Sequence, residues 1–110
     1  MANVFKLKTK DGGAVGANTD MTIYTVPAAT TTVVIGCTIA NTTASSITVD
    51  AKLENADGDN IHIGKDLPIP TGSSLDILAG KIVMETTDVM KIQSDTANST
   101  QIALSIMEQT

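Results

Sequence analysis

The chain has 110 residues, which predicts a single domain, 1–110, with one core that needs no disulfide or metal to hold it. Its net charge is −5, all of its cations are Lys, and it has one Phe, one Tyr and no Trp. Nucleic-acid grooves need clustered Arg and Lys beside aromatic rings, and a membrane-spanning helix needs about 20 consecutive apolar residues. We therefore expect no nucleic-acid partner and no membrane span.

Alternation between apolar and polar residues, with Val, Ile and Thr supplying about a third of the chain, predicts β-strands throughout. No segment has the three-and-four spacing of an amphipathic helix. Turn-forming residues separate the alternating segments. This pattern predicts an all-β fold, an antiparallel β-sandwich of about eight strands, either jelly-roll or immunoglobulin-like. The predicted strands cover residues 3–8, 20–26, 32–41, 46–55, 60–64, 74–79, 81–85, 88–94 and 100–108.

The first predicted strand places Phe5 and Leu7 on the face opposite Lys6 and Lys8, as in a half-buried strand. Residues 9–19 follow it, with three glycines and no large side chain. We predict a flexible Gly-rich loop near 9–19. The alternative is an arm that becomes ordered only against a neighbouring subunit.

Residues 32–41 are apolar on both faces of their predicted strand, unlike the other strands. Either the strand is central and covered on both sides, or one of its faces meets a neighbouring subunit. Cys37 lies in this run and is the only cysteine, so an intrachain disulfide is excluded. We expect Cys37 to be a buried small hydrophobic residue and not a nucleophile.

The polar residues offer little chemistry. The only His, His62, alternates with two isoleucines and is predicted to face solvent. Residues 55–60, Asn-Ala-Asp-Gly-Asp-Asn, predict a hairpin turn; a weak divalent-cation site is the alternative, but Gly58 between the aspartates breaks the EF-hand spacing. We expect no enzyme: no catalytic residue, no cofactor-binding residue and no metal ligand is assigned.

Two prolines flank an isoleucine at Pro68, Ile69 and Pro70. Because Pro cannot donate a ladder hydrogen bond, the three residues are predicted to form a corner at a strand edge or in a connection. Three consecutive antiparallel strands are expected after this corner, with turns at 79–80 and 85–88.

Residues 23–53 join a Tyr-x-Val-Pro-Ala start to an Ala-Asn-Thr-Thr-Ala turn and an alternating strand. Residues 67–110 combine a Pro-x-Gly-Ser-Ser-Leu turn, a hairpin that begins Gly-Lys-Ile-Val and a last strand ending in Glu-x-Thr. These signatures resemble small virion structural proteins of tailed bacteriophages, over about residues 20–110. Thr86-Thr87-Asp88 stands where that family usually has Ala-Gly-Asp.

The resemblance implies a non-enzymatic phage virion protein, most directly a capsid decoration or cement protein. A neck or tail accessory protein, and a receptor- or carbohydrate-binding module of a fibre with Tyr24 as its aromatic platform, are the alternatives. The expected partners are the major capsid protein or neck and tail proteins, in a virion assembled in the host cytoplasm. A homo-oligomer, as a trimer, is expected. The candidate interface residues are Pro68, Ile69, Pro70, Val34 and Tyr24.

Overall fold

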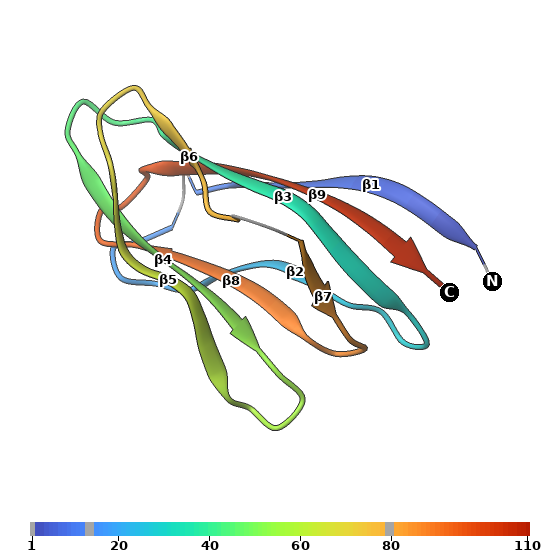
Figure 1. Ribbon diagram of the computed structural model, residues 1–110. Coiled ribbons are helices and arrows are strands. Elements are labelled where there is room, and N and C mark those ends of the chain that lie inside the picture. The colour runs from blue at the N-terminus through green and yellow to red at the C-terminus, as the bar shows by residue number, and fades with distance from the viewer. Residues whose placement is uncertain (1, 13–14, 79–80) are drawn as a thin grey trace.

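A computed structural model describes residues 2–12, 15–78 and 81–110 and shows two antiparallel sheets packed face to face (Figure 1). The prediction of an all-β sandwich is therefore confirmed. No helix long enough and apolar enough to cross a membrane occurs in the described residues. The strands are β1 (Asn3–Asp11), β2 (Met21–Thr25), β3 (Thr31–Asn41), β4 (Ile47–Glu54), β5 (Asn60–Ile69), β6 (Ser74–Asp76), β7 (Ile82–Met84), β8 (Val89–Ser94) and β9 (Thr100–Gln109).

The strand order identifies the sandwich as a jelly-roll. Sheet A has the order β1-β9-β3-β6, with β7 also paired to β3, and sheet B has the order β2-β8-β4-β5. Strands therefore pair from the two chain ends inward: β1 with β9, β2 with β8, β3 with β6 and β7, and β4 with β5. An immunoglobulin-like sandwich would pair its first two strands in one sheet. Here β1 and β2 lie in different sheets, which decides between the two alternatives.

The three strands expected as consecutive antiparallel neighbours are distributed differently. β6 and β7 do not pair with each other, because both lie along the same edge of β3, and β8 lies in the other sheet. The predicted turn at 85–88 crosses between the sheets, with the Asp88 N–H donating to the Glu85 carbonyl at 3.0 Å. Thr87 has φ 76°, a left-handed conformation that is uncommon for a β-branched residue and favours Gly. The turn predicted at 79–80 lies outside the described residues.

The strand predicted at 60–64 is longer than expected and includes Pro68 and Ile69, while the expected place of Pro68 at a strand edge is confirmed. β5 continues to Ile69, with Pro68 opposite Thr48 and Ile69 opposite Ile47. β5 is the edge strand of sheet B, and an edge strand tolerates Pro where its nitrogen side faces away from the neighbouring strand. The turn follows at Pro70, whose carbonyl accepts the Ser73 N–H at 3.2 Å.

β1 continues to Asp11 and does not end at residue 8, so the start of the predicted flexible loop belongs to a strand. The next residues are tied to the β8–β9 end of the sandwich: the Gly12 N–H donates to the Thr100 carbonyl and the Asn18 N–H to the Ser94 carbonyl, both at 2.8 Å. A Cβ at Gly12 would lie 2.7 Å from the Thr100 hydroxyl, so this close approach needs glycine. Residues 13–14 lie outside the described residues, and mobility of the loop stays a prediction.

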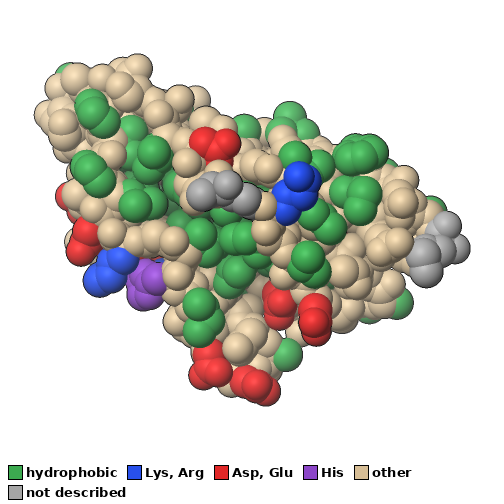
Figure 2. Space-filling view, in the orientation of Figure 1, with side chains coloured by type: hydrophobic (Ala, Val, Ile, Leu, Met, Phe, Trp, Pro, Cys, Tyr) green, Lys and Arg blue, Asp and Glu red, His purple; other side chains and the backbone are tan. Residues whose placement is uncertain are grey.

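The aliphatic core lies between the sheets. β3 illustrates the layering: Val34, Cys37 and Ile39 point inward and are fully buried, whereas Ile35 points outward and is exposed. β3 is central in its sheet, but no described strand covers its outward face. Figure 2 looks onto the side bounded by β5, β6 and β7, where hydrophobic side chains are only partly covered. Those half-buried side chains include Ile63, Leu67, Leu75, Ile77, Leu78 and Ile82.

Candidate interaction surface

The outward face of sheet A can be built up row by row from the strand register. In an antiparallel pair, residues directly opposite each other point to the same side of the sheet. Phe5 is opposite Met107, Met107 is opposite Val33, and Val33 is opposite Val83. Four large apolar side chains therefore form one continuous row across β1, β9, β3 and β7. We call this row, Phe5, Met107, Val33 and Val83, the ridge.

The ridge is exposed to an unusual degree for its composition. Phe5 is 72% exposed and Val83 61%, and next to the ridge Leu7 is 64% and Ile35 42% exposed. Single exposed apolar residues are common on soluble proteins, but a contiguous apolar patch is typical of an interaction site. The only Phe of the chain lies in this patch and not in the core.

Small side chains occupy the same face farther along the strands. The register places Thr9 opposite Ala103 and Ala103 opposite Thr38. Because these side chains are short, the surface is hollowed there, with a volume of about 370 Å³. We call this depression the hollow. Its outward-pointing lining comprises Thr9, Asp11, Thr38, Ala40, Gln101 and Ala103.

One row separates the ridge from the hollow. Leu7 is opposite Ser105, and Ser105 is opposite Gly36, beside the bulge that shifts the register of β3 between Val34 and Gly36. The bulge adds one residue, Ile35, to the outward surface between the ridge and this middle row. The face thus runs from large apolar side chains through a mixed row to small ones.

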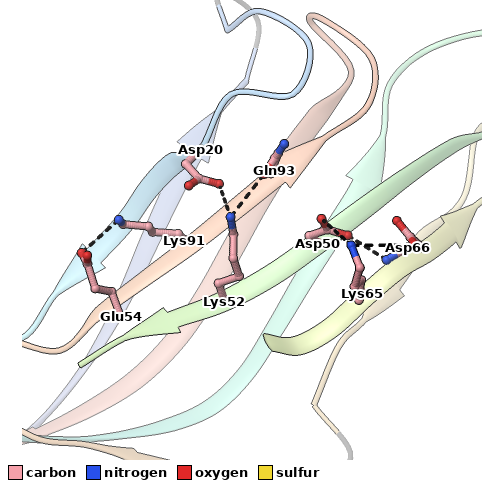
Figure 3. A network of polar contacts seen from close by, with 8 residues as sticks. All are labelled: Asp20, Asp50, Lys52, Glu54, Lys65, Asp66, Lys91 and Gln93. Atoms are coloured by element: carbon pink, nitrogen blue, oxygen red, sulfur yellow. Dashed lines mark hydrogen bonds and ion pairs between the residues drawn. The ribbon is translucent and has the colours of Figure 1, made fainter. Parts of the chain in front are cut away.

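The outward face of sheet B has a different character. Lys52 Nζ lies 2.8 Å from Asp20 and 3.3 Å from Gln93, and Lys91 Nζ lies 2.9 Å from Glu54 (Figure 3). Lys65 lies 4.0 Å from Asp50, at the β4–β5 edge. Figure 3 labels the eight residues of these polar contacts: Asp20, Asp50, Lys52, Glu54, Lys65, Asp66, Lys91 and Gln93. These groups hydrogen-bond one another and water, so this face needs no covering partner.

A buried polar cluster links the two sheets behind the ridge. Tyr24 of β2 donates its hydroxyl proton to Glu108 of β9 and accepts from Thr32 of β3 at 2.8 Å. Lys6 of β1 donates to the other Glu108 oxygen at 2.7 Å. Burial, together with the Glu108 carboxylate, raises the pKa of Tyr24 to about 12. The Lys6 ammonium and the Tyr24 hydroxyl hold the pKa of Glu108 below its usual value.

This cluster stabilises structure and offers no open reaction site. Tyr24 is 6% exposed and Glu108 is also buried, and none of the buried polar side-chain atoms in the described residues lacks a hydrogen-bond partner. A carbohydrate platform needs an exposed aromatic ring. The fibre-module alternative therefore loses the aromatic residue on which it depended.

The remaining chemical candidates are also accounted for. Cys37 is buried, as predicted, and its burial raises the thiol pKa to about 12, so no thiolate nucleophile forms there. His62 is exposed on β5 opposite Lys52, as predicted. The 55–60 segment forms the predicted hairpin turn, in which the Asn55 side chain accepts the N–H groups of Asp57 and Asp59 at 3.0 Å each. No cluster of three potential metal ligands occurs among the described residues.

The five predicted interface residues differ in their exposure to solvent. Val34 and Ile69 are fully buried and Tyr24 nearly so, because all three point between the sheets. These three cannot contact a partner on the folded domain, which corrects the expectation for them. Pro68 and Pro70 are exposed on either side of Ile69. A virion contact at these two prolines stays a prediction.

The ridge and the hollow were missed by the sequence prediction. Alternation in 3–8 separates Phe5 and Leu7 from the lysines, and an amphipathic strand would turn its apolar side inward. The register shows the reverse: Lys6 is opposite Ile106 and Lys8 is opposite Leu104, both inward-pointing residues of β9. Inward-pointing charges are a known protection of edge strands. The signal for this site is that Phe5, the only aromatic residue of β1, alternates with lysines on a strand at the edge of its sheet.

The comparisons with known proteins give only distant resemblances. No family model matches the chain, and no curated protein sequence is similar to it. A chain from Bacillus endospore appendages, which form a family of disulfide-linked pili, has a TM-score of 0.49 and 15% identity, covering 97% of this chain and 82% of that one.

Two chains of infectious bursal disease virus are also similar in fold. The Gt-strain chain has a TM-score of 0.45 and 9% identity, covering 98% of this chain and 30% of that one. The Gx-strain chain has a TM-score of 0.46 and 10% identity, covering 98% and 37%. Resemblance at this level assigns neither a family nor a function.

Proposed function

We propose that this protein is a non-enzymatic structural subunit of a phage particle, and that it decorates or cements the capsid. The observation that carries the proposal is the uncovered ridge on the outward face of sheet A. A side chain as apolar as Phe5, held 72% exposed beside Leu7 and Val83, is stabilised when a protein surface covers it. A subunit that completes its surface by assembly is what repeated contacts in a particle require.

The chemistry of the chain supports the same proposal. In the described residues the thiol of Cys37 is buried and His62 is exposed on β5. The buried Tyr24 hydroxyl and Glu108 carboxylate are hydrogen-bonded to each other. No pair of groups in this set combines an accessible nucleophile with a base. Jelly-rolls build many viral capsid domains, an analogy of architecture alone.

The expected partners are the major capsid protein or the neck and tail proteins of the same virion, with several copies acting together. Many weak contacts then add to a stable attachment. The phage-protein resemblance adds the expectation of a homo-oligomer. The exposed Pro68 and Pro70 are the proposed contact to the particle, because they lie at an edge of sheet B well separated in the fold from the ridge.

Co-sedimentation tests the proposal. Purified protein is mixed with expanded empty capsids of its phage and, separately, with isolated tails, and each mixture is pelleted. We expect saturable binding to capsids that is weakened in Pro68→Ala/Pro70→Ala. Asp57→Ala, at the tip of the β4–β5 hairpin, is the matched exposed control and should bind like the unmodified protein. Binding to tails alone would move the protein to the neck or tail, and binding to neither would contradict the proposal.

A further inference from the structure

We infer that the outward face of sheet A binds a second copy of the same face, related by a two-fold axis, with each ridge seated in the hollow of its partner. The inference goes beyond the role in a particle and does not rest on it. It starts from the order of the rows: ridge, middle row and hollow follow one another along the same three strands. A surface that is raised at one end and hollowed at the other is the shape that a two-fold axis makes complementary to itself.

The register fixes where that axis lies. If it passes across the strands at the middle row, Leu7 of one copy meets Leu7 of the other. Each residue then faces the one equally far on the other side of the middle row. Phe5 faces Thr9, Met107 faces Ala103, and Val33 faces Thr38, so that each ridge side chain of these three strands meets a small one.

The hollow gives the ridge of a second copy a space to fill. The hollow measures about 370 Å³, and sheet faces pack at about 10 Å when large and small side chains interdigitate. A partner that presented a flat surface would leave the hollow empty. The ridge of a second copy fills it, and the same contact is made twice.

The charges of the face also permit a second copy, although each chain carries −5. The ridge and the middle row hold no charged residue, and the two acidic residues of the outward rows, Asp11 and Asp76, lie at the ends of their rows. Under the two-fold axis Asp11 faces Asn3 and Asp76 faces Val83, so neither acid faces another acid. Burial of the face therefore brings no like charges into direct opposition.

Pairing of two copies through the edge of β1 is disfavoured by its lysines. The outer edge of β1 pairs with no described strand. If two β1 strands paired antiparallel about Leu7, Lys6 of one would lie opposite Lys8 of the other, twice. Like charges directly opposite destabilise a strand pair, so the second copy meets the face and not the edge.

The area sets the expected strength. Nine paired residues along β1 and four strand positions across the sheet span roughly 30 by 19 Å, or about 550 Å² per copy. That is below the ~800 Å² per partner of a standard interface and is typical of weaker complexes. We expect a dimer with a dissociation constant in the micromolar range.

A swap within β9 tests the ridge-in-hollow contact. Ala103→Met fills the hollow and Met107→Ala lowers the ridge; each is expected to weaken the dimer at least about tenfold, because bulk meets bulk or a gap remains. Ala103→Met combined with Met107→Ala exchanges the two positions and restores large against small. We expect the double variant to return to within about threefold of the unmodified protein.

Sedimentation equilibrium and native mass spectrometry of the purified protein give the readout. Thr25→Met adds the same kind of bulk to the outward face of sheet B and should leave the dimer unchanged, while urea denaturation shows that each variant folds. The inference is overturned by a monomer at about 200 µM, by a trimer, or by losses that add in the double variant. Because the dimer is measured on pure protein, a failure to dimerise does not affect the capsid-binding result. A failure to bind capsids likewise does not affect the measurement of the dimer.

Discussion

The outward faces of the two sheets differ in the side chains that they present to solvent. On sheet B, lysines and carboxylates are paired across neighbouring strands, as with Lys91 of β8 and Glu54 of β4. On sheet A, the equivalent positions hold Phe5, Leu7 and Val83, which water cannot satisfy. One sandwich therefore has one face that is complete in the monomer and one that is not. Among the described residues, four of the six exposed large apolar side chains, Phe5, Leu7, Ile35 and Val83, lie on the outward face of sheet A, whereas Val4 and Ile61 lie elsewhere.

The largest expected effect comes from placing a charge on each face. Leu7→Lys on β1 and Thr25→Lys on β2 are matched, since both positions are exposed and lie on the edge strand of their sheet. Leu7→Lys removes apolar burial and sets two lysines together at the two-fold axis. We expect it to weaken self-association by about 100-fold or more, measured by sedimentation velocity.

Thr25→Lys is expected to leave association unchanged. Both variants should keep the unfolding free energy of the monomer within about 0.5 kcal/mol, because neither side chain is buried in it. Equal loss of association in the two variants would show that the faces do not differ in function, and would remove the basis of the comparison.

A smaller effect is expected at Glu108, the acid that ties β1 to the core behind the ridge. Its pKa is lowered by Lys6 and Tyr24, so the carboxylate stabilises the fold fully above its unfolded value near 4.5. That stability is lost as pH falls through the lower folded value. Asp95, whose pKa is lowered chiefly by the Thr48 N–H, contributes in the same direction.

Glu108→Gln separates the two contributions. We expect it to cost about 2 kcal/mol at pH 7, the range for hydrogen bonds to a charged group. As pH falls from 4.5 through the lower folded pKa, the difference between the variant and the unmodified protein should shrink, because Glu108 becomes protonated and both proteins then carry an uncharged group at 108. Urea denaturation between pH 7 and 3 measures it; a difference that stays constant with pH would mean that Glu108 is not held as a carboxylate.

Much of the fold could be predicted from the sequence, because alternation and turn residues are local signals. Strands at 46–55 and 100–108 were predicted to within a residue or two of β4 and β9. Which sheet each strand joins is not local: β7 and β8 flank one short turn yet lie in opposite sheets. The strand at 60–64 was predicted too short, because Pro68 interrupts the local strand signal although β5 continues to Ile69 along the sheet edge.

The candidate surface could not be predicted for a related reason. A two-residue period says that Phe5 and Leu7 share a side, but not which side faces the core. That depends on the inward row of β9, and β1 and β9 are separated by most of the chain. The hollow is a property of three strands together, so no single stretch of sequence carries it.

The smallest expected effect distinguishes the faces by the sign of their salt dependence. Partly exposed ion pairs such as Lys91–Glu54 on sheet B are weakened by salt, so raising NaCl from about 0.05 to 0.5 M should lower the unfolding free energy by a few tenths of a kcal/mol. Self-association through sheet A should respond oppositely, because salt screens the repulsion between two chains of charge −5 and no ion pair is made in the contact. We expect the dimer to tighten about two- to threefold over the same range. Association that weakens with salt would instead indicate that charged groups hold the copies together, which would assign the contact to the outward face of sheet B.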